Sequence, residues 1–134
     1  MTGSTPDTAI HEEDLTVVLV IYGLYIASLL AFPPGAIIGI VMAHSGLQAA
    51  GPVAASHLRF QVRTFWIGLL AWAFAGAAVF WGGLLSVILV GLPLLFAASF
   101  GILAIWLWAL LRSAFGLAWA VQKKACPRPE SLTI

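Results

Sequence analysis

Residues 65–121 contain a single charged side chain, Arg112, in a stretch dominated by Leu, Ala, Ile, Val, Phe and Trp. A helix that crosses a bilayer needs about 20 predominantly apolar residues, so this stretch has room for at least two spans. No water-soluble domain of this size can bury such a stretch in its core. A second apolar run, residues 15–43, adds at least one more span. The pattern predicts an all-α, polytopic membrane protein.

Composition supports the same class. The chain has 134 residues, of which 62% are hydrophobic and 8% are charged, whereas soluble domains carry about 25% charged residues. The net charge of +1 gives no reason to expect nucleic acid as a partner. A single cysteine, Cys126, excludes an internal disulfide and leaves a free thiol in a C-terminal tail. The acidic residues Glu12, Glu13 and Asp14 precede the first apolar run, where a signal peptide needs basic residues, and carboxylates there favour a helix start.

Two consecutive prolines, Pro33 and Pro34, interrupt the first apolar run. Each disfavours helical geometry in the residue before it. One outcome is a tight hairpin with helices at about 15–32 and 35–50. The other is a single span kinked at Pro33-Pro34. We expect the hairpin, and therefore four short transmembrane helices; three spans, with the first one kinked, are the alternative.

The later spans are expected at about 60–81 and 84–112, with an interfacial extension to residue 121. Gly82-Gly83 is the predicted turn between them, and Gly91-Leu92-Pro93 is a second possible break. Arg112 falls at the end of the last span, where it can reach the headgroups. Residues 1–14 form a polar tail that we expect to be disordered, residues 15–121 form one transmembrane domain, and residues 122–134 form a C-terminal tail.

Basic residues predict the orientation. Arg59 and Arg63 precede one span, and Lys123, Lys124 and Arg128 follow the last. Two spans separate these clusters, so both can face the cytoplasm, as the positive-inside rule requires. We therefore expect a multi-pass protein of the inner (plasma) membrane with a cytoplasmic C-terminus.

The polar chemistry is concentrated in residues 56–64, together with Arg112. At 100° per residue, one helix face carries His57, Gln61 and Thr64, and another carries Arg59, Arg63 and Trp66. The candidate residues for binding an acidic partner or anionic lipid are His57, Arg59, Gln61, Arg63 and Arg112. The alternative is that these charges only set the topology. Small-residue pairs that allow close helix packing are Gly35 with Gly39 and Ala97 with Gly101.

Catalytic chemistry is not indicated. The apolar runs carry no carboxylate, and the chain has no Gly-rich phosphate loop and no Ser/His/Asp constellation. We therefore expect no enzyme activity, no metal and no cofactor. A haem- or metal-binding redox subunit that uses His44 and His57 is a less favoured alternative, because axial ligands normally sit within facing spans.

The segment from Ser56 to Trp66 resembles a family of small bacterial membrane proteins of unknown function. These proteins carry a His-x-Arg-aromatic-Gln-x-Arg-Thr-Phe-Trp motif and are distantly similar to the channel subunit of the plastid inner-envelope import translocon. The resemblance covers about residues 15–121, including Gly39 to His44 and Arg112-x-x-x-Gly116-Leu117. It implies a bacterial membrane protein, and the plastid subunit's four spans favour the hairpin at Pro33-Pro34 by analogy.

The functional expectation is a non-enzymatic interaction or assembly partner that uses the Arg/His motif at the cytoplasmic interface. Its expected partners are membrane lipids and another membrane protein or a second copy of itself. The alternative, which rests on the resemblance, is an oligomeric translocation or channel subunit. One copy offers too few polar side chains in its spans to line a pore.

Overall fold

The computed structural model describes residues 14–31, 34–130 and 132. Within these residues the secondary structure is helical, which confirms the all-α class: α1 (Thr16–Leu30), α2 (Pro34–Gly46), α3 (Pro52–Leu85), the 3-10 turn η1 (Ser86–Ile88) and α4 (Gly91–Val121). The polar tail predicted for the N-terminus lies almost entirely outside the described residues.

The start of α1 is fixed by Asp14. Its Oδ1 atom accepts a hydrogen bond from the Thr16 backbone N–H at 2.9 Å and from the Thr16 hydroxyl at 2.5 Å. These bonds, the hydroxyl first, lower the pKa of the Asp14 carboxyl. A carboxylate at this end of a helix also interacts favourably with the helix dipole. The other two acidic residues expected here, Glu12 and Glu13, lie outside the described residues.

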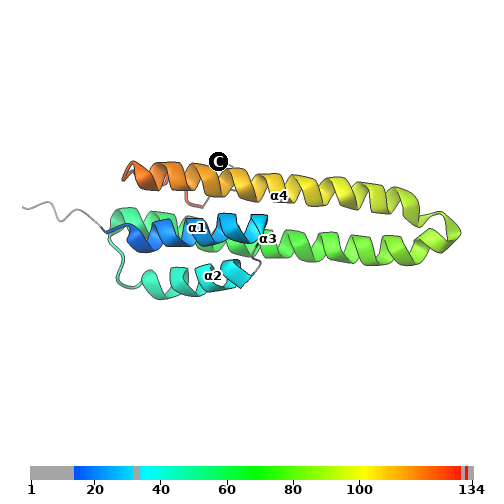
Figure 1. Ribbon diagram of the computed structural model, residues 1–134, viewed down its shortest axis with the longest axis horizontal. Coiled ribbons are helices and arrows are strands. Elements are labelled where there is room, and N and C mark those ends of the chain that lie inside the picture. The colour runs from blue at the N-terminus through cyan, green and yellow to red at the C-terminus, as the bar shows by residue number, and fades with distance from the viewer. Residues whose placement is uncertain (1–13, 32–33, 131, 133–134) are drawn as a thin grey trace, which may run out of the picture.

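The first two helices form a hairpin. α1 and α2 run side by side in opposite directions (Figure 1), with many contacts between them. The close approach depends on Gly39, because a Cβ there would lie 2.6 Å from Cε1 of Tyr25. A single kinked helix is therefore wrong for this segment. α2 ends at Gly46, earlier than the expected residue 50, and residues 47–49 form a turn.

The second two helices form a much longer hairpin. α3 begins at Pro52, well before the expected span at 60, because proline is well suited to the first turn and Gly51 precedes it in an extended conformation. The helix has 34 residues and is about 51 Å long at 1.5 Å per residue. α4 has 31 residues and is about 46 Å long by the same rise. It returns along α3 over its whole length (Figure 1).

The turn between α3 and α4 lies at residues 86–90, so the prediction of a turn at Gly82-Gly83 was wrong. Leu89 makes the turn with a left-handed φ of 64°. The glycines serve close packing instead. A Cβ on Gly82 would sit 3.1 Å from the Leu95 side chain, and a Cβ on Gly91 would collide with the Gly82 carbonyl oxygen. Glycine at these two positions lets the ends of the two helices touch.

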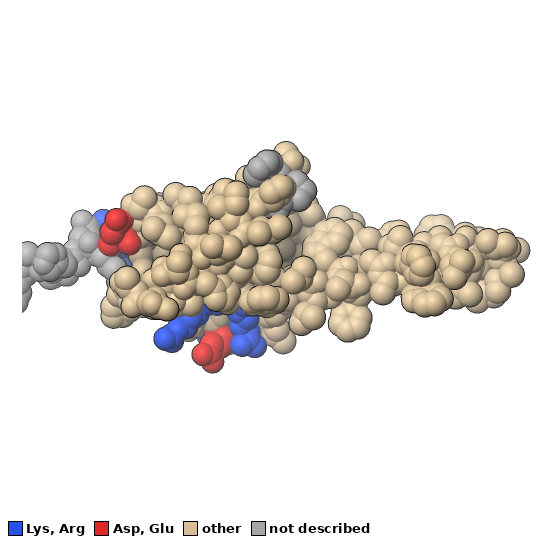
Figure 2. All heavy atoms as spheres, turned by 90° about the horizontal axis from the view of Figure 1, so that it is seen from below, with Lys and Arg blue, Asp and Glu red and all other residues tan. Residues whose placement is uncertain are grey.

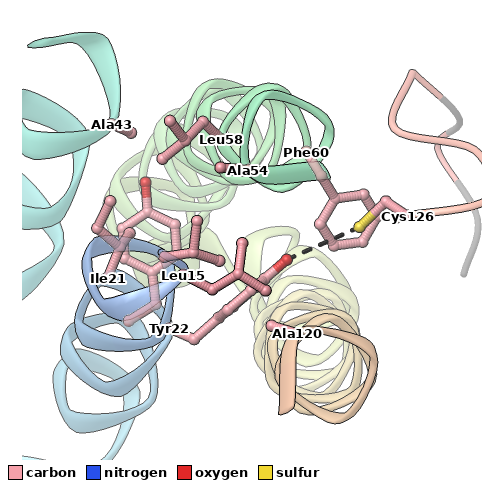
Figure 3. Packing of buried hydrophobic residues seen from close by; sticks show 11 residues of the cluster. Leu15, Ile21, Tyr22, Ala43, Ala54, Leu58, Phe60, Ala120 and Cys126 are labelled. Carbon is pink, nitrogen blue, oxygen red and sulfur yellow. Dashed lines mark hydrogen bonds between the residues drawn. The ribbon is translucent and has the colours of Figure 1, made fainter. Parts of the chain in front are cut away.

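The molecule has two unlike halves (Figure 1). In one half, α1 and α2 pack against the first part of α3 and the last part of α4; in the other, α3 and α4 project alone. Buried apolar side chains gather in the four-helix half and include Ile21, Tyr22, Leu58, Phe60 and Ala120 (Figure 3). The projecting half exposes large apolar side chains along both helices, including Phe74, Phe80, Leu84, Phe96 and Phe100.

Within the described residues, two helices are long and apolar enough to cross a membrane by length and composition: α3 together with η1, and α4. α1 has 15 residues and α2 has 13, which correspond to about 22 and 20 Å. Both are shorter than the hydrocarbon core of a bilayer, about 30 Å. On the face shown in Figure 2, Lys and Arg side chains lie only on the four-helix half, and the projecting hairpin shows none.

Candidate functional site

The first turns of α3 divide the polar motif between two faces. His57, Gln61 and Thr64 point into the bundle and are 0%, 1% and 6% exposed. Arg59 and Arg63 are exposed on another face. The helical period of the sequence produces this division. The motif therefore contains two sets of residues, a buried set that packs α3 and an exposed set that can meet a partner.

Arg112 belongs to the buried set. It is 0% exposed, so the expectation that it reaches the headgroups was wrong. Its Nε donates a hydrogen bond of 2.7 Å to the Thr64 hydroxyl oxygen, and that hydroxyl donates to the Phe60 carbonyl at 2.6 Å. The guanidinium lies 3.9 Å from the centre of the Phe60 ring and 5.4 Å from the Trp108 ring. A hydrogen bond and two aromatic faces compensate in part for the desolvation of the charge.

His57 lies between α1 and the C-terminal tail. Its Nε2 is 2.7 Å from the Lys124 carbonyl oxygen. A carbonyl only accepts, so Nε2 carries the proton. In the neutral ring Nδ1 is then an acceptor. It faces the Tyr22 hydroxyl at 3.1 Å and the Cys126 thiol at 3.2 Å. Both ring nitrogens therefore make contacts that hold α3, α1 and the tail together.

The C-terminal tail folds back onto the bundle instead of extending away from it. Cys126 donates its backbone N–H to the Ser56 hydroxyl at 3.1 Å. Its Sγ is 3.9 Å from the Tyr22 hydroxyl, the contact drawn in Figure 3. Further along, Trp108 Nε1 donates to the Leu132 carbonyl at 3.0 Å. The thiol is free, as expected, but buried.

The Cys126 thiol is not set up as a nucleophile. Burial raises its pKa to about 11, although the hydrogen bond from Tyr22 acts in the opposite direction. The thiol is therefore protonated at neutral pH, and the thiolate is the reactive form of cysteine. The group formed by Tyr22, His57 and Cys126, which we call the tail clasp, is a structural contact.

Gln61 ties α3 to α1. Its side-chain Nε2 donates to the Val18 carbonyl at 3.0 Å, and its backbone carbonyl accepts from the Tyr25 hydroxyl at 3.3 Å. Among the described residues, the side-chain oxygen Oε1 has no hydrogen-bond partner. The residue is thus positioned by packing, and no external partner can reach it without opening the bundle.

No family model, curated protein or solved structure matches this chain. The resemblance in residues 56–66 therefore stays a prediction.

The remaining candidates lie in different environments. Gly35 and Gly39 are buried in the α1–α2 hairpin. Ala97 is exposed, and a Cβ on Gly101 would meet nothing within 4 Å, so among the described residues no close helix contact depends on a small side chain at these positions. His44 is exposed, with Nδ1 3.0 Å from the Ile40 carbonyl. No group of three His, Cys, Asp or Glu side chains among the described residues is placed to hold a metal ion.

The signals that sequence reasoning missed are long-range contacts. Tyr22 stands in an apolar run, and Cys126 stands in a polar tail, with no local pattern that joins either one to His57. Gly116 was a partial clue to the position of Tyr22, because a Cβ at residue 116 would collide with the Tyr22 ring. Arg112 and Gly116 are four residues apart and therefore share a helix face that had to pack closely.

Proposed function

We propose that this is an integral membrane protein in which Arg59 and Arg63 form a docking face for an acidic segment of another protein at the cytoplasmic interface. The supporting observation is the division of the α3 motif. Contacts of His57, Gln61 and Thr64 fix the rotation of the helix, so that Arg59 and Arg63 point away from the bundle. The two arginines are four residues apart and lie on adjacent turns, which suits binding to neighbouring carboxylates.

We base the placement in the membrane on two uncharged stretches of nearly equal length. Residues 64–85 of α3 carry no charge, and residues 91–111 of α4 carry none. Each is about 32–33 Å long, close to the hydrocarbon thickness of about 30 Å. The bond between Arg112 and Thr64 joins the two helices at the same end of both stretches. We place the hydrocarbon core between this bond and the turn at residues 86–90.

In this placement Arg63 lies at the edge of the hydrocarbon core and Arg59 lies about one turn further out, so both side chains can extend to the headgroup level. The positive-inside rule assigns this level to the cytoplasmic side. α1 and α2 flank the same end of α3 and are too short to cross, so we propose that they form a hairpin that enters the inner leaflet and returns. Both termini are then cytoplasmic. Four complete spans remain the alternative, which also puts both termini inside.

A pore is less well supported. In the projecting halves of α3 and α4, the Ser86 and Ser99 hydroxyls each donate to a carbonyl of their own chain segment, at 2.6 and 2.8 Å. They offer little to an ion or a polar substrate. An oligomer would be required to line a channel, and planar-bilayer recordings that show reproducible conductance would favour that function over docking.

The docking function is tested by affinity purification in mild detergent followed by mass spectrometry. The wild type is compared with Arg59→Ala/Arg63→Ala. The matched control is Lys123→Asn/Lys124→Gln, which removes two positive charges from the same side and keeps the backbone carbonyl of residue 124 that His57 contacts. Asparagine tolerates the left-handed φ of 56° at position 123.

The expected result is an acidic partner that co-purifies with the wild type and the control but is lost from the arginine variant. Equal recovery from all three proteins contradicts the proposal. Loss from both variants would show that net positive charge, and not the Arg59/Arg63 face, holds the partner.

A further inference from the structure

A cavity of about 560 Å³ lies where the α1–α2 hairpin ends and α3 and α4 continue alone. All four helices contribute to its wall: Tyr25 and Leu29 from α1, Ile37 from α2, Thr64 and Trp72 from α3, and Trp106 from α4. Its volume falls within the range of about 300–1,000 Å³ that is typical of ligand pockets. The cavity is separate from the Arg59/Arg63 face, which does not line it.

The polarity of the wall changes along the membrane normal. Thr64 and Ser113 line one end with their hydroxyls, at the level where the charge-free parts of α3 and α4 begin. The other two hydroxyl-bearing residues of the wall, Tyr25 and Ser28, donate to the backbone carbonyls of Gln61 and Leu24. Two turns deeper the wall is made by the indoles of Trp72 and Trp106. The Trp106 ring is held in place because its Nε1 donates to the Leu29 carbonyl at 2.9 Å. The cavity is thus polar toward the headgroups and aromatic toward the bilayer centre.

We propose that this cavity binds a neutral membrane amphiphile, a molecule with one hydrocarbon chain and a small uncharged hydroxyl- or carbonyl-bearing head. Such a molecule is dissolved in the bilayer with its polar end outward, which is the orientation that the wall requires. Its head would meet the Ser113 hydroxyl and could donate to the second lone pair of the Thr64 hydroxyl oxygen, whose proton and first lone pair are used by Phe60 and Arg112. Its chain would lie against Trp72 and Trp106. This inference rests on the membrane placement proposed above but not on the docking partner.

The wall selects against a charged head. No Lys, Arg, His, Asp or Glu stands among the described residues that line the cavity. The nearest cation, Arg112, lies behind Thr64, bonded to its hydroxyl and stacked on Phe60. An anionic head at this depth would lose its hydration without a lining cation to replace it, and burial of an unpaired charge is strongly unfavourable. A neutral head loses much less.

The chain offers a matched pair of substitutions for the test. Gly68 lines the cavity, and a Cβ there meets nothing within 4 Å, so Gly68→Leu places its side chain in the cavity without a backbone clash. Gly76 lies on the same helix, has equally open space, and does not line the cavity. Gly76→Leu therefore controls for the change in helix propensity and apolarity. Thermal unfolding of both variants checks that they are folded.

The probe is a monoacylglycerol with a photoactivatable diazirine in its acyl chain, added to purified protein in detergent micelles. Labelled peptides are mapped by mass spectrometry. We expect saturable labelling of peptides that contain Trp72 or Trp106 in the wild type and in the control variant, Gly76→Leu. In Gly68→Leu the labelling should fall about tenfold, which corresponds to about 1.4 kcal/mol of binding free energy.

Competition distinguishes the class of head. Unlabelled monoacylglycerol should displace the probe, and neither oleate nor phosphatidylglycerol should do so at the same concentration. Equal labelling of the two leucine variants, or labelling that does not saturate, overturns the site. Displacement by the anionic lipids as effectively as by monoacylglycerol overturns the neutral class. Neither result bears on the Arg59/Arg63 face, whose failure would appear only in the affinity purification.

Discussion

The Nε atom of Arg112 donates a hydrogen bond of 2.7 Å to the Thr64 hydroxyl across the α3–α4 interface. Between this bond and the turn at residues 86–90, neither long helix carries a charged side chain. The bond also places the only charged side chain of residues 65–121 inside the protein, and not in lipid. The arginine therefore contributes to the packing of the bundle, while Arg59 and Arg63 remain available at the surface.

Replacement of Thr64 by valine should destabilise the protein. The change keeps the side-chain volume but removes the acceptor of the Arg112 Nε–H, which leaves a buried donor of a charged group unsatisfied. We expect a loss of about 1.5–3 kcal/mol in the free energy of unfolding, measured by SDS titration in mixed micelles. Thr64→Ser, which keeps the hydroxyl, should lose less than half as much. Equal stability of Thr64→Val and the wild type would show that the bond contributes nothing.

A methyl group at Gly116 should also destabilise the bundle. The Cβ of Gly116→Ala would collide with the Tyr22 ring, and that ring is wedged against His57, with ring centres 5.9 Å apart. Overpacking of this kind costs about 1–3 kcal/mol. Gly101→Ala is the control, because a Cβ there meets nothing within 4 Å, and the better helix propensity of alanine should leave it neutral or slightly stabilised. The same unfolding titration applies, and similar stabilities for both variants would refute the contact.

The Cys126 thiol should make stability fall at alkaline pH. An unfolded cysteine ionises near pH 8.5, whereas burial raises the pKa of Cys126 to about 11 in the fold. Below the unfolded pKa both states are protonated and the stabilisation is complete. As pH rises toward the folded pKa, only the unfolded state loses its proton, so stability decreases.

The check on this thiol effect is unfolding between pH 8 and 10 for the wild type and Cys126→Ser. The serine variant should show a shallower pH dependence, because its hydroxyl does not ionise in this range. The wild-type thiol should also react slowly with a maleimide until the protein is unfolded. Rapid labelling of the folded protein at neutral pH would contradict the buried tail clasp.

The short α1–α2 hairpin predicts a specific pattern of membrane accessibility. In a Cys126→Ser background, Ala31→Cys lies at the exposed end of α1 and should be inaccessible from outside the cell to a membrane-impermeant maleimide. Val87→Cys, in the α3–α4 turn, should react from outside. If both positions react from outside, α1 and α2 cross completely, and the four-span arrangement is correct.

The sequence was sufficient to predict the all-α class and the rotation of α3. The helical period separated His57 and Gln61 from Arg59 and Arg63, because alternation on a helix surface is a local property. The break at Pro33-Pro34 was equally local. By contrast, the position of the turn between α3 and α4 could not be predicted without knowing whether the glycines near it form the turn or allow close helix packing. Gly82 and Gly91 serve packing, which is a property of the partner helix and not of the local sequence.

The tail clasp and the cavity could not be predicted from the sequence, because both depend on contacts between residues far apart in the chain. His57 meets Cys126 across 69 residues of chain, and Trp106 meets Leu29 across 77. No periodicity within either segment encodes such a pair. Arg112 was misplaced for a related reason. A cation at the end of an apolar run normally extends to the headgroups, and only the position of Thr64 and Phe60 on the neighbouring helix shows that it is held inside.

The most direct test of the docking face is site-specific photocrosslinking in cells. Trp66 and Phe115 are exposed aromatic residues on α3 and α4, 50% and 45% exposed, so a benzophenone amino acid replaces either with little disturbance. Trp66 shares the face of Arg59 and Arg63. We predict a discrete crosslinked protein from position 66 that disappears with Arg59→Ala/Arg63→Ala, and none from position 115. A crosslink from position 66 that persists without the two arginines, or the absence of any crosslink there, would contradict the proposed function.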